Sequence, residues 1–219
     1  MIYWPNKLAP VSVAINLAPR SLGGSAAISG MQQNVSSSAG VWIIAYEGIA
    51  VVGADRIKMW RAIQAQTDGR VNKIVLPIRN TSQLRPGGKL YGGKIGFSDG
   101  GSFSDGSQYA SDIGATMGAD AARGATEITI AGPVSLLDAG QHFSIGERLH
   151  IIKYLGDVTS TSAAVKVSPP LREAAVAGTS LNFIRPVCTV RLGSDTEMDL
   201  TLTANRYGSP TVRFVEDLS

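Results

Sequence analysis

The sequence is poor in the residues on which metal and disulfide chemistry depends. Its 219 residues include one cysteine, Cys188, and two histidines, His142 and His150. A single thiol excludes a disulfide scaffold and a zinc site built from cysteines. Two histidines leave little material for a histidine-rich metal centre. We therefore expect no metal and no cofactor, and we interpret Cys188, which sits among valines, as a buried and inert thiol.

Charge and aromatic residues are also scarce. Charged residues make up 17% of the chain and aromatic residues 6%, and the 20 Lys and Arg residues exceed the 17 Asp and Glu residues only slightly. A net charge of +3 is too small to indicate a dedicated nucleic-acid binder. A hydrophobic fraction of 44% argues against intrinsic disorder. Few charges and 25 glycines together suggest a surface that is largely covered by neighbouring subunits.

Export and membrane signals are weak in this sequence. Residues Met1–Lys7 lack the basic start and the apolar core of a signal peptide. The longest apolar run, Val41–Val52, is interrupted by Glu47 and Gly48 and is about half as long as a membrane-spanning helix. We expect synthesis in a cytoplasm, without export by the usual route and without a membrane span.

Two strands are predicted before residue 50. Apolar residues alternate with polar or small ones over Val11–Leu17, which is the pattern of a half-buried strand. Pro10 and Pro19 flank this segment and are expected to end the strand on both sides. Residues 21–40 are rich in Gly, Ser and Ala and are expected to form a loop or a poorly specified edge segment. Residues 41–47 are apolar on both faces, which is typical of a central strand.

One helix is predicted, over Asp55–Thr67. Ile57, Trp60 and Ile63 recur at helical spacing and should anchor the helix on the core. Gly69 suits the left-handed position that follows a helix. Alternation returns at residues 74–78, so that residues 41–78 are predicted to form strand, helix and strand.

The second half of the chain begins with a glycine-rich stretch. Residues 85–124 contain few core-forming side chains and are expected to be a functional loop or a mobile one. Strand patterns resume from residue 125 and continue to the end of the chain, including an alternating segment at residues 198–202. The whole pattern of about nine or ten short strands predicts an all-β fold with one helix.

Common catalytic motifs are absent from the sequence. Residues 87–90 contain Gly-Lys but lack the other residues of a phosphate-binding loop, and residues 92–96 have no strand-turn-helix context for a dinucleotide. No serine occupies a nucleophile elbow that His142 or His150 could serve. Asp99 and Asp105 lack the spacing of a calcium loop and are better explained as turn residues. We therefore expect no catalytic residue and a protein that is not an enzyme.

Six residues are candidates for contacts with a subunit or a ligand. Four aromatic residues in the glycine-rich stretch could stack on sugars or bases, but anchoring on a neighbouring subunit is the more common use of such residues. Two arginines beside prolines could form ion pairs across a subunit interface or be solvated. The six are Tyr91, Phe97, Phe103, Tyr109, Arg172 and Arg185.

Two stretches of the sequence resemble a known family. The first is Trp42–Leu76, which holds an aromatic strand, the helix with Trp-Arg-Ala-Ile, and Asp-Gly-Arg followed by Leu-Pro. The second comprises Leu137–His150, Val167–Arg172 and Pro186–Val187. In order and spacing these motifs are similar to those of distal tail proteins, the ring-forming adaptors at the tip of long phage tails. Gln141 replaces a usual Asp, and residues 73–75 replace an aromatic residue.

The resemblance implies a fold and a function. A tail-tube-like β-sandwich with one helix would comprise residues 1–79 and 186–219, and an inserted, small OB-like β-barrel would lie within residues 80–185. The chain would be a structural virion protein of the phage tail, forming a hexameric ring between the tail tube protein and the tip hub or baseplate, with tail fibres as a further partner. The alternative is a carbohydrate-binding module of the tail tip that serves adsorption to the host.

Overall fold

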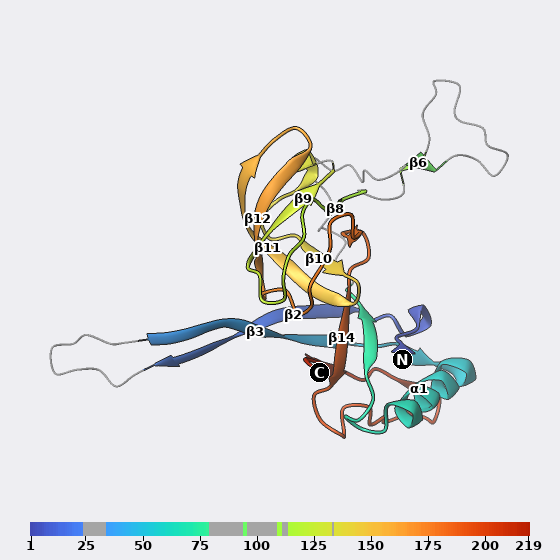
Figure 1. Ribbon diagram of the computed structural model, residues 1–219. Coiled ribbons are helices and arrows are strands. Elements are labelled where there is room, and N and C mark those ends of the chain that lie inside the picture. The colour runs from blue at the N-terminus through green and yellow to red at the C-terminus, as the bar shows by residue number, and fades with distance from the viewer. Residues whose placement is uncertain (24–33, 79–93, 96–108, 111–113, 133) are drawn as a thin grey trace. The chain divides into compact units, whose positions relative to one another are not determined.

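The computed structural model describes residues 1–23, 34–78, 94–95, 109–110, 114–132 and 134–219 (Figure 1). The chain is mostly β-sheet, and it forms two compact units. The first unit contains Met1–Pro77 and Cys188–Ser219, and the second contains Ile78–Val187. These limits lie within two residues of the boundaries that the composition change near residue 80 and Pro186 suggest.

The first unit is built on a six-stranded sheet with the order β1-β5-β14-β16-β3-β2. β1 pairs with β5 in parallel, whereas β14, β16, β3 and β2 pair in antiparallel fashion along the sheet. The strands are β1 (Ile2–Tyr3), β2 (Ser12–Gly23), β3 (Asn34–Glu47), β5 (Ile74–Pro77), β14 (Val187–Leu192) and β16 (Val212–Glu216).

Among the described residues there is one α-helix, α1 (Gly53–Thr67), which begins two residues before the predicted start. Ile57, Trp60 and Ile63 are buried, because their spacing places them on one face of the helix. Asp55 lies in the first turn, where the helix dipole favours an acidic side chain. The helix ends at Asp68, which adopts a left-handed conformation with φ 47°.

An aromatic cluster fills the core between the helix and the sheet. The ring of Trp4 packs edge-on against Trp60, Tyr46 and Phe214, with ring centroids 5.4–6.2 Å apart. Such edge-to-face pairs are favoured by the charge distribution of aromatic rings. The indole nitrogen of Trp60 donates to the carbonyl of Met198 at 2.9 Å, and that of Trp4 donates to Leu8 at 2.8 Å. Both polar groups are therefore satisfied inside the core.

The predicted strand at residues 198–202 is wrong. Residues 195–198 form a turn, and residues 199–202 run on without ladder pairing. Met198 is buried because it packs beneath the helix and accepts the bond from Trp60. Leu200 and Leu202 are half-buried, and their side chains lie close to Gly208, so the alternation does not mark membership of a sheet. Short strands β15 (Tyr207–Gly208) and β4 (Val51–Val52) pair beside this segment, and a 3₁₀ turn, η1 (Asn6–Leu8), follows β1.

The second unit is a nearly closed, barrel-like sheet of six strands with the order β13-β10-β11-β12-β9-β8. Its two end strands approach each other through an antiparallel bridge between Thr116 and Ser180. The amide of Met117 donates to Thr179, and that of Leu181 donates to Ala115, both at 2.9 Å. The strands are β8 (Thr116–Met117), β9 (Glu127–Ala131), β10 (His142–Ile145), β11 (Arg148–Val158), β12 (Ser162–Ser168) and β13 (Leu181–Asn182).

The barrel has its own core, in which Phe143 and Phe183 stack with ring centroids 5.1 Å apart. Ala115 and Met117 belong to this core. The expectation of a loop over residues 85–124 is therefore wrong for the short strands at residues 94–95, 109–110 and 116–117, whereas residues 118–124 are mostly exposed and belong to no strand. The 3₁₀ turn η3 (Val134–Leu136) follows β9. Two further strands, β6 (Lys94–Ile95) and β7 (Tyr109–Ala110), pair with each other.

Candidate assembly surface

The hairpin of β2 and β3 continues past the other strands of its sheet (Figure 1). β16 pairs with β3 only from Tyr46 to Ile43. At the next residue, the backbone amide of Trp42 donates instead to the side chain of Glu216 at 3.1 Å. Beyond this point, the strand pairing of β3 within the described residues is with β2. We call residues Ala18–Gly23 and Asn34–Val41 the ribbon.

A register irregularity marks the base of the ribbon and accommodates Pro19. Ala18 pairs with Val41, but Arg20 pairs with Ser37, so β3 has two more residues than β2 in this interval. Proline is tolerated at such a bulge and on an edge strand, because no ladder hydrogen bond is required of its nitrogen. The prediction that Pro19 ends the strand is therefore wrong.

Gly40 lies close to Leu17 and Ala18 of β2, where a larger side chain would be crowded. A Cβ atom on Gly40 would lie 3.0 Å from the Leu17 side chain and 3.1 Å from the carbonyl of Ala18. Residues 21–23 and 34–40 form strand, with β2 at the edge of the sheet, so of the two alternatives for residues 21–40 these residues match the edge segment and not the loop. Residues 24–33 lie outside the described residues.

The ribbon lacks the means to be stable by itself. A two-stranded hairpin is at best marginally stable in water. The ribbon lies beyond the last residue of β3 that β16 pairs with, and strands at the edge of a sheet favour pairing with another chain. Small polar residues such as Ser21 and Ser36 also specify register weakly. A partner that adds a strand or covers a face would supply the missing stabilisation.

The six predicted contact residues are not gathered into one described site. Tyr91, Phe97 and Phe103 lie outside the described residues. Tyr109 pairs with Ile95 in the β6–β7 hairpin. Arg172 is half-buried after β12. Arg185 is exposed in a turn that Asn182 closes, since the Asn182 side chain accepts from the Arg185 amide at 3.0 Å and donates to its carbonyl at 2.8 Å.

The two histidines and the cysteine lie on strands and are buried or half-buried. His142 is half-buried on β10, and burial lowers the pKa of its imidazole. His150 is buried on β11 with Nδ1 3.0 Å from the carbonyl oxygen of Pro169, and its ring packs beside Phe143. Cys188 is a buried free thiol.

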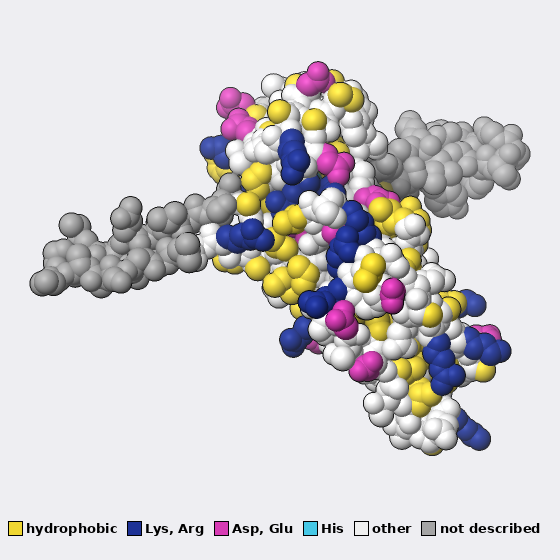
Figure 2. All heavy atoms as spheres, turned by 60° about the horizontal axis from the view of Figure 1, so that its bottom comes forward, with side chains coloured by type: hydrophobic (Ala, Val, Ile, Leu, Met, Phe, Trp, Pro, Cys, Tyr) yellow, Lys and Arg dark blue, Asp and Glu magenta, His cyan; other side chains and the backbone are white. Residues whose placement is uncertain are grey.

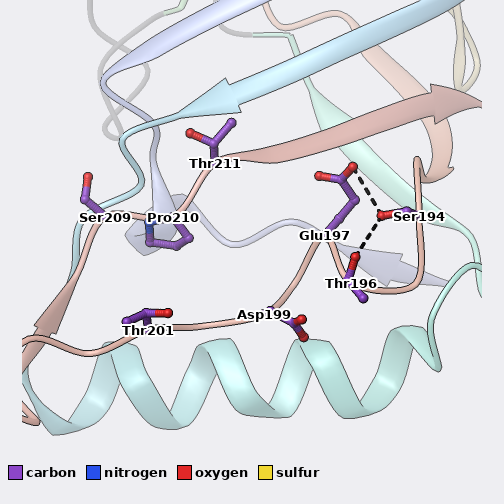
Figure 3. Close-up of a pocket in the computed structure, with 8 residues that line it drawn as sticks. All are labelled: Ser194, Thr196, Glu197, Asp199, Thr201, Ser209, Pro210 and Thr211. Carbon is purple, nitrogen blue, oxygen red and sulfur yellow. Dashed lines mark hydrogen bonds between the residues drawn. The ribbon is translucent and has the colours of Figure 1, made fainter.

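A polar pocket of about 300 Å³ lies in the first unit between the 194–201 segment and the start of β16 (Figure 3). Glu197 is its best-anchored member. One of its oxygens accepts from the backbone amide of Arg213 at 2.9 Å, and the other accepts from the hydroxyl of Ser194 at 3.4 Å. Ser194 also lies 3.2 Å from the hydroxyl of Thr196. These bonds attach the turn to β16. We therefore interpret the polar residues of the pocket as structural, because they hold this turn in place.

A buried carboxylate closes the end of the first unit. Asp217 is 4% exposed, and its two oxygens lie 2.7 Å from Lys73 Nζ and 2.7 Å from Arg191 Nε. Ser219 donates to both oxygens at 3.0 and 3.1 Å. Arg191 also donates to the carbonyls of Arg70 and Val71. The cluster therefore connects β5, β14 and the segment after β16 to the turn that follows α1.

These partners determine the pKa of Asp217. Burial raises the pKa of its carboxyl group, but hydrogen bonds from Lys73, Arg191 and Ser219 and the charge of Arg191 lower it more. The pKa consequently falls from 3.8 to about 2. Because the folded-state pKa is depressed, the stabilisation is fully present above pH 3.8 and is lost as the pH falls through about 2.

We predict that Asp217→Asn lowers the free energy of unfolding of the first unit by about 2 kcal/mol at pH 7, because a shift of this size corresponds to that energy. Urea unfolding at pH 7, 4 and 2.5 would measure it. The difference from wild type should shrink at the lowest pH. Asp195→Asn is the matched control, because Asp195 pairs with Arg70 at 3.2 Å on an open surface and should give no measurable change. Equal effects of the two variants would contradict the prediction.

Basic and acidic side chains are interspersed on the face drawn in Figure 2, where Asp and Glu lie between Lys and Arg. Hydrophobic side chains appear there in scattered groups. No helix of the described chain is long and apolar enough to cross a membrane. No group of three or more metal-ligating residues occurs among the described residues.

Comparison with protein-family models gives no match, and comparison with curated proteins gives none either. The resemblance to distal tail proteins therefore rests on the motifs of the sequence alone.

Proposed function

We propose that the protein is a structural component of a phage virion, which forms a hexameric ring at the distal end of the tail. In this function the ring joins the tail tube to the tip hub or baseplate, after synthesis in the host cytoplasm. The protein acts by assembly, without catalysis and without a cofactor. Tail fibres are a further partner.

The ribbon is the observation that carries this proposal. It presents residues of β2 and β3 that are register partners beyond the last residue of β3 that β16 pairs with, and a sheet edge of this kind can be extended by a strand from a neighbour. The contacts that generate a ring are heterologous, because one surface of each subunit binds a different surface of the next. The ribbon and the body of the next sheet are a suitable pair of different surfaces.

The two units have different parts in the proposal. The first unit, with its sheet and single helix, corresponds to the tail-tube-like β-sandwich that forms the ring. The second unit, with its barrel-like sheet, corresponds to the OB-like insertion. A separate core in each unit suits this division, because the insertion then folds without altering the ring-forming sheet.

Purified full-length protein tests the proposal directly. We expect light scattering coupled to gel filtration to give a mass about six times the chain mass of 22.9 kDa, and negative-stain micrographs to show six-fold rings. Persistent monomers at high protein concentration would contradict the ring. A closed ring with another number of subunits would contradict the hexamer while leaving the assembly role intact.

A further inference from the structure

The polar pocket of the first unit lies at the end of the sheet opposite the ribbon, which points away from α1 (Figure 1). Three of its lining residues, 209–211, directly precede β16, and β16 begins by pairing with Tyr46 of β3. The amide of Ile49, which follows β3, donates to the carbonyl of Pro210 at 3.0 Å. The pocket is therefore attached where β3 ends, whereas the ribbon lies where β3 begins.

The ribbon of one chain cannot reach the pocket of the same chain. Arg20 on the ribbon is the register partner of Ser37, and β3 continues from Ser37 to Glu47. At about 3.3 Å per residue, this stretch of strand is roughly 30 Å long. That length is far greater than the reach of an arginine side chain. A contact between ribbon and pocket therefore requires two copies of the chain.

The charges of the ribbon and of the pocket are opposite. Arg20 is exposed and is the only charged residue in residues 18–41 of the sequence. The described residues that line the pocket include two carboxylates, Glu197 and Asp199, beside serine and threonine hydroxyls, and include no Lys or Arg. Glu197 bonds to Ser194 and so holds the turn (Figure 3). The Asp199 carboxylate takes no part in these bonds and is exposed, so it can accept a cation from outside.

Exposed apolar side chains lie beside the pocket. Val11 is 84% exposed, Val52 55% and Tyr207 50%. A Cβ atom on Gly48 would lie 3.3 Å from Val11 and 3.7 Å from the hydroxyl of Ser209, which places Val11 next to the pocket. Tyr207 pairs with Val52 across β15 and β4, two residues before Ser209. Exposed tyrosines are common anchors of protein interfaces, and burial of these apolar groups would add free energy to an ion pair.

We propose that this pocket, with the apolar side chains beside it, receives the ribbon of a neighbouring copy, and that Arg20 of that copy pairs with Asp199. The inference rests on the proposed ring function and names the surface that binds the ribbon. Opposite ends of the sheet form a heterologous contact, which repeats from copy to copy and can close into a ring. Cover by the apolar side chains would exclude water and strengthen the ion pair.

Charge reversal on either side tests the contact in the full-length protein, with gel filtration coupled to light scattering as the measurement. We expect Arg20→Glu and Asp199→Lys each to weaken association at least about tenfold, because like charges then face each other. Combining the two substitutions should recover the rings, since the attraction is restored with its direction exchanged. Arg123→Glu and Glu127→Lys are the matched controls, because both residues are exposed in the second unit and outside these surfaces.

A third variant tests the apolar part of the surface without changing its charge. Tyr207→Ala should also weaken association at least about tenfold, as expected for loss of an interface anchor. Val71→Ala is its control, because Val71 is 62% exposed in the turn after α1. Tryptophan fluorescence would confirm that each variant is folded.

The outcomes separate this contact from the ring itself. Rings formed by both charge-reversal variants, or rings lost in both and not recovered by their combination, would overturn the pairing of Arg20 with Asp199 and leave the ring function intact. Wild-type assembly by the Tyr207→Ala variant would remove the apolar part of the surface from the contact. A wild-type protein that stays monomeric would contradict the ring function and this contact together.

Discussion

Replacing Trp60 with alanine is expected to lower the free energy of unfolding of the first unit by about 3–5 kcal/mol, the usual cost of truncating a buried aromatic side chain. Trp60 is fully buried, and its ring lies 6.2 Å from that of Trp4. The substitution would also remove the 2.9 Å hydrogen bond to Met198 and leave a buried carbonyl without its donor. Few domains have more than about 5–15 kcal/mol of stability, so this loss is a large fraction of the whole.

Urea unfolding monitored by tryptophan fluorescence suits this measurement. Trp4, Trp42 and Trp60 are the three tryptophans of the chain, and all lie in the first unit, so their emission does not report on unfolding of the barrel. Arg61→Ala is the matched control, because Arg61 is exposed on the same helix and should change stability by no more than about 0.5 kcal/mol. A Trp60→Ala variant that unfolds at the wild-type urea concentration would refute the packing of α1 on Trp4.

Removing the ribbon is expected to abolish assembly and leave a folded monomer. Ala18 and Val41 are register partners, so replacing residues 19–40 with Asn-Gly should close a two-residue hairpin at the base of the ribbon. The core strand residues Trp42, Ile44 and Tyr46 are untouched by this change. Gel filtration with light scattering would measure the mass, and tryptophan fluorescence would confirm that the first unit is folded.

A smaller replacement separates the ribbon from its tip. Gly23 and Asn34 are also register partners, so replacing residues 24–33 with Asn-Gly retains both ribbon strands. We expect this variant to assemble as the wild type does, because the strand edges that bind the neighbour remain. Rings formed without residues 19–40 would show that the ribbon is not the assembly element. If the variant without residues 24–33 forms no rings although its ribbon strands remain, residues 24–33 and not the strands would be the assembly element.

The ribbon was not predictable from the pattern of apolar residues. A strand is recognised in a sequence when one of its faces is buried, because burial then imposes a period of two. Residues 34–38 are asparagine, valine and serines without such a period. They form a strand because they pair with β2. A local sequence pattern does not show which distant residues will pair, so this strand could not be recognised. Pro19 misled the prediction for a related reason, since the bulge that accommodates it depends on the partner strand.

The Asp217 cluster was equally hidden from the sequence. Lys73 precedes β5, Arg191 lies in β14 and Asp217 follows β16, and each is an ordinary charged residue when considered separately. Arg148 and Glu173 are also distant in sequence, and they meet only because the segment after β12 is bonded to residues 120–125. The alternation at residues 198–202 shows the opposite error, in which a true burial pattern was assigned to the wrong kind of element.

The sequence by itself determined the mostly β character and the single described helix with its buried face. These features depend on periodicity and composition, which are local properties of the chain. Only the tertiary structure decided which strands pair, and therefore that β2 and β3 extend beyond the other strands of their sheet. It also decided which charged side chains share a site. Pairing and ion-pair formation join residues far apart in sequence, and their free energy depends on the partner as much as on the residue itself.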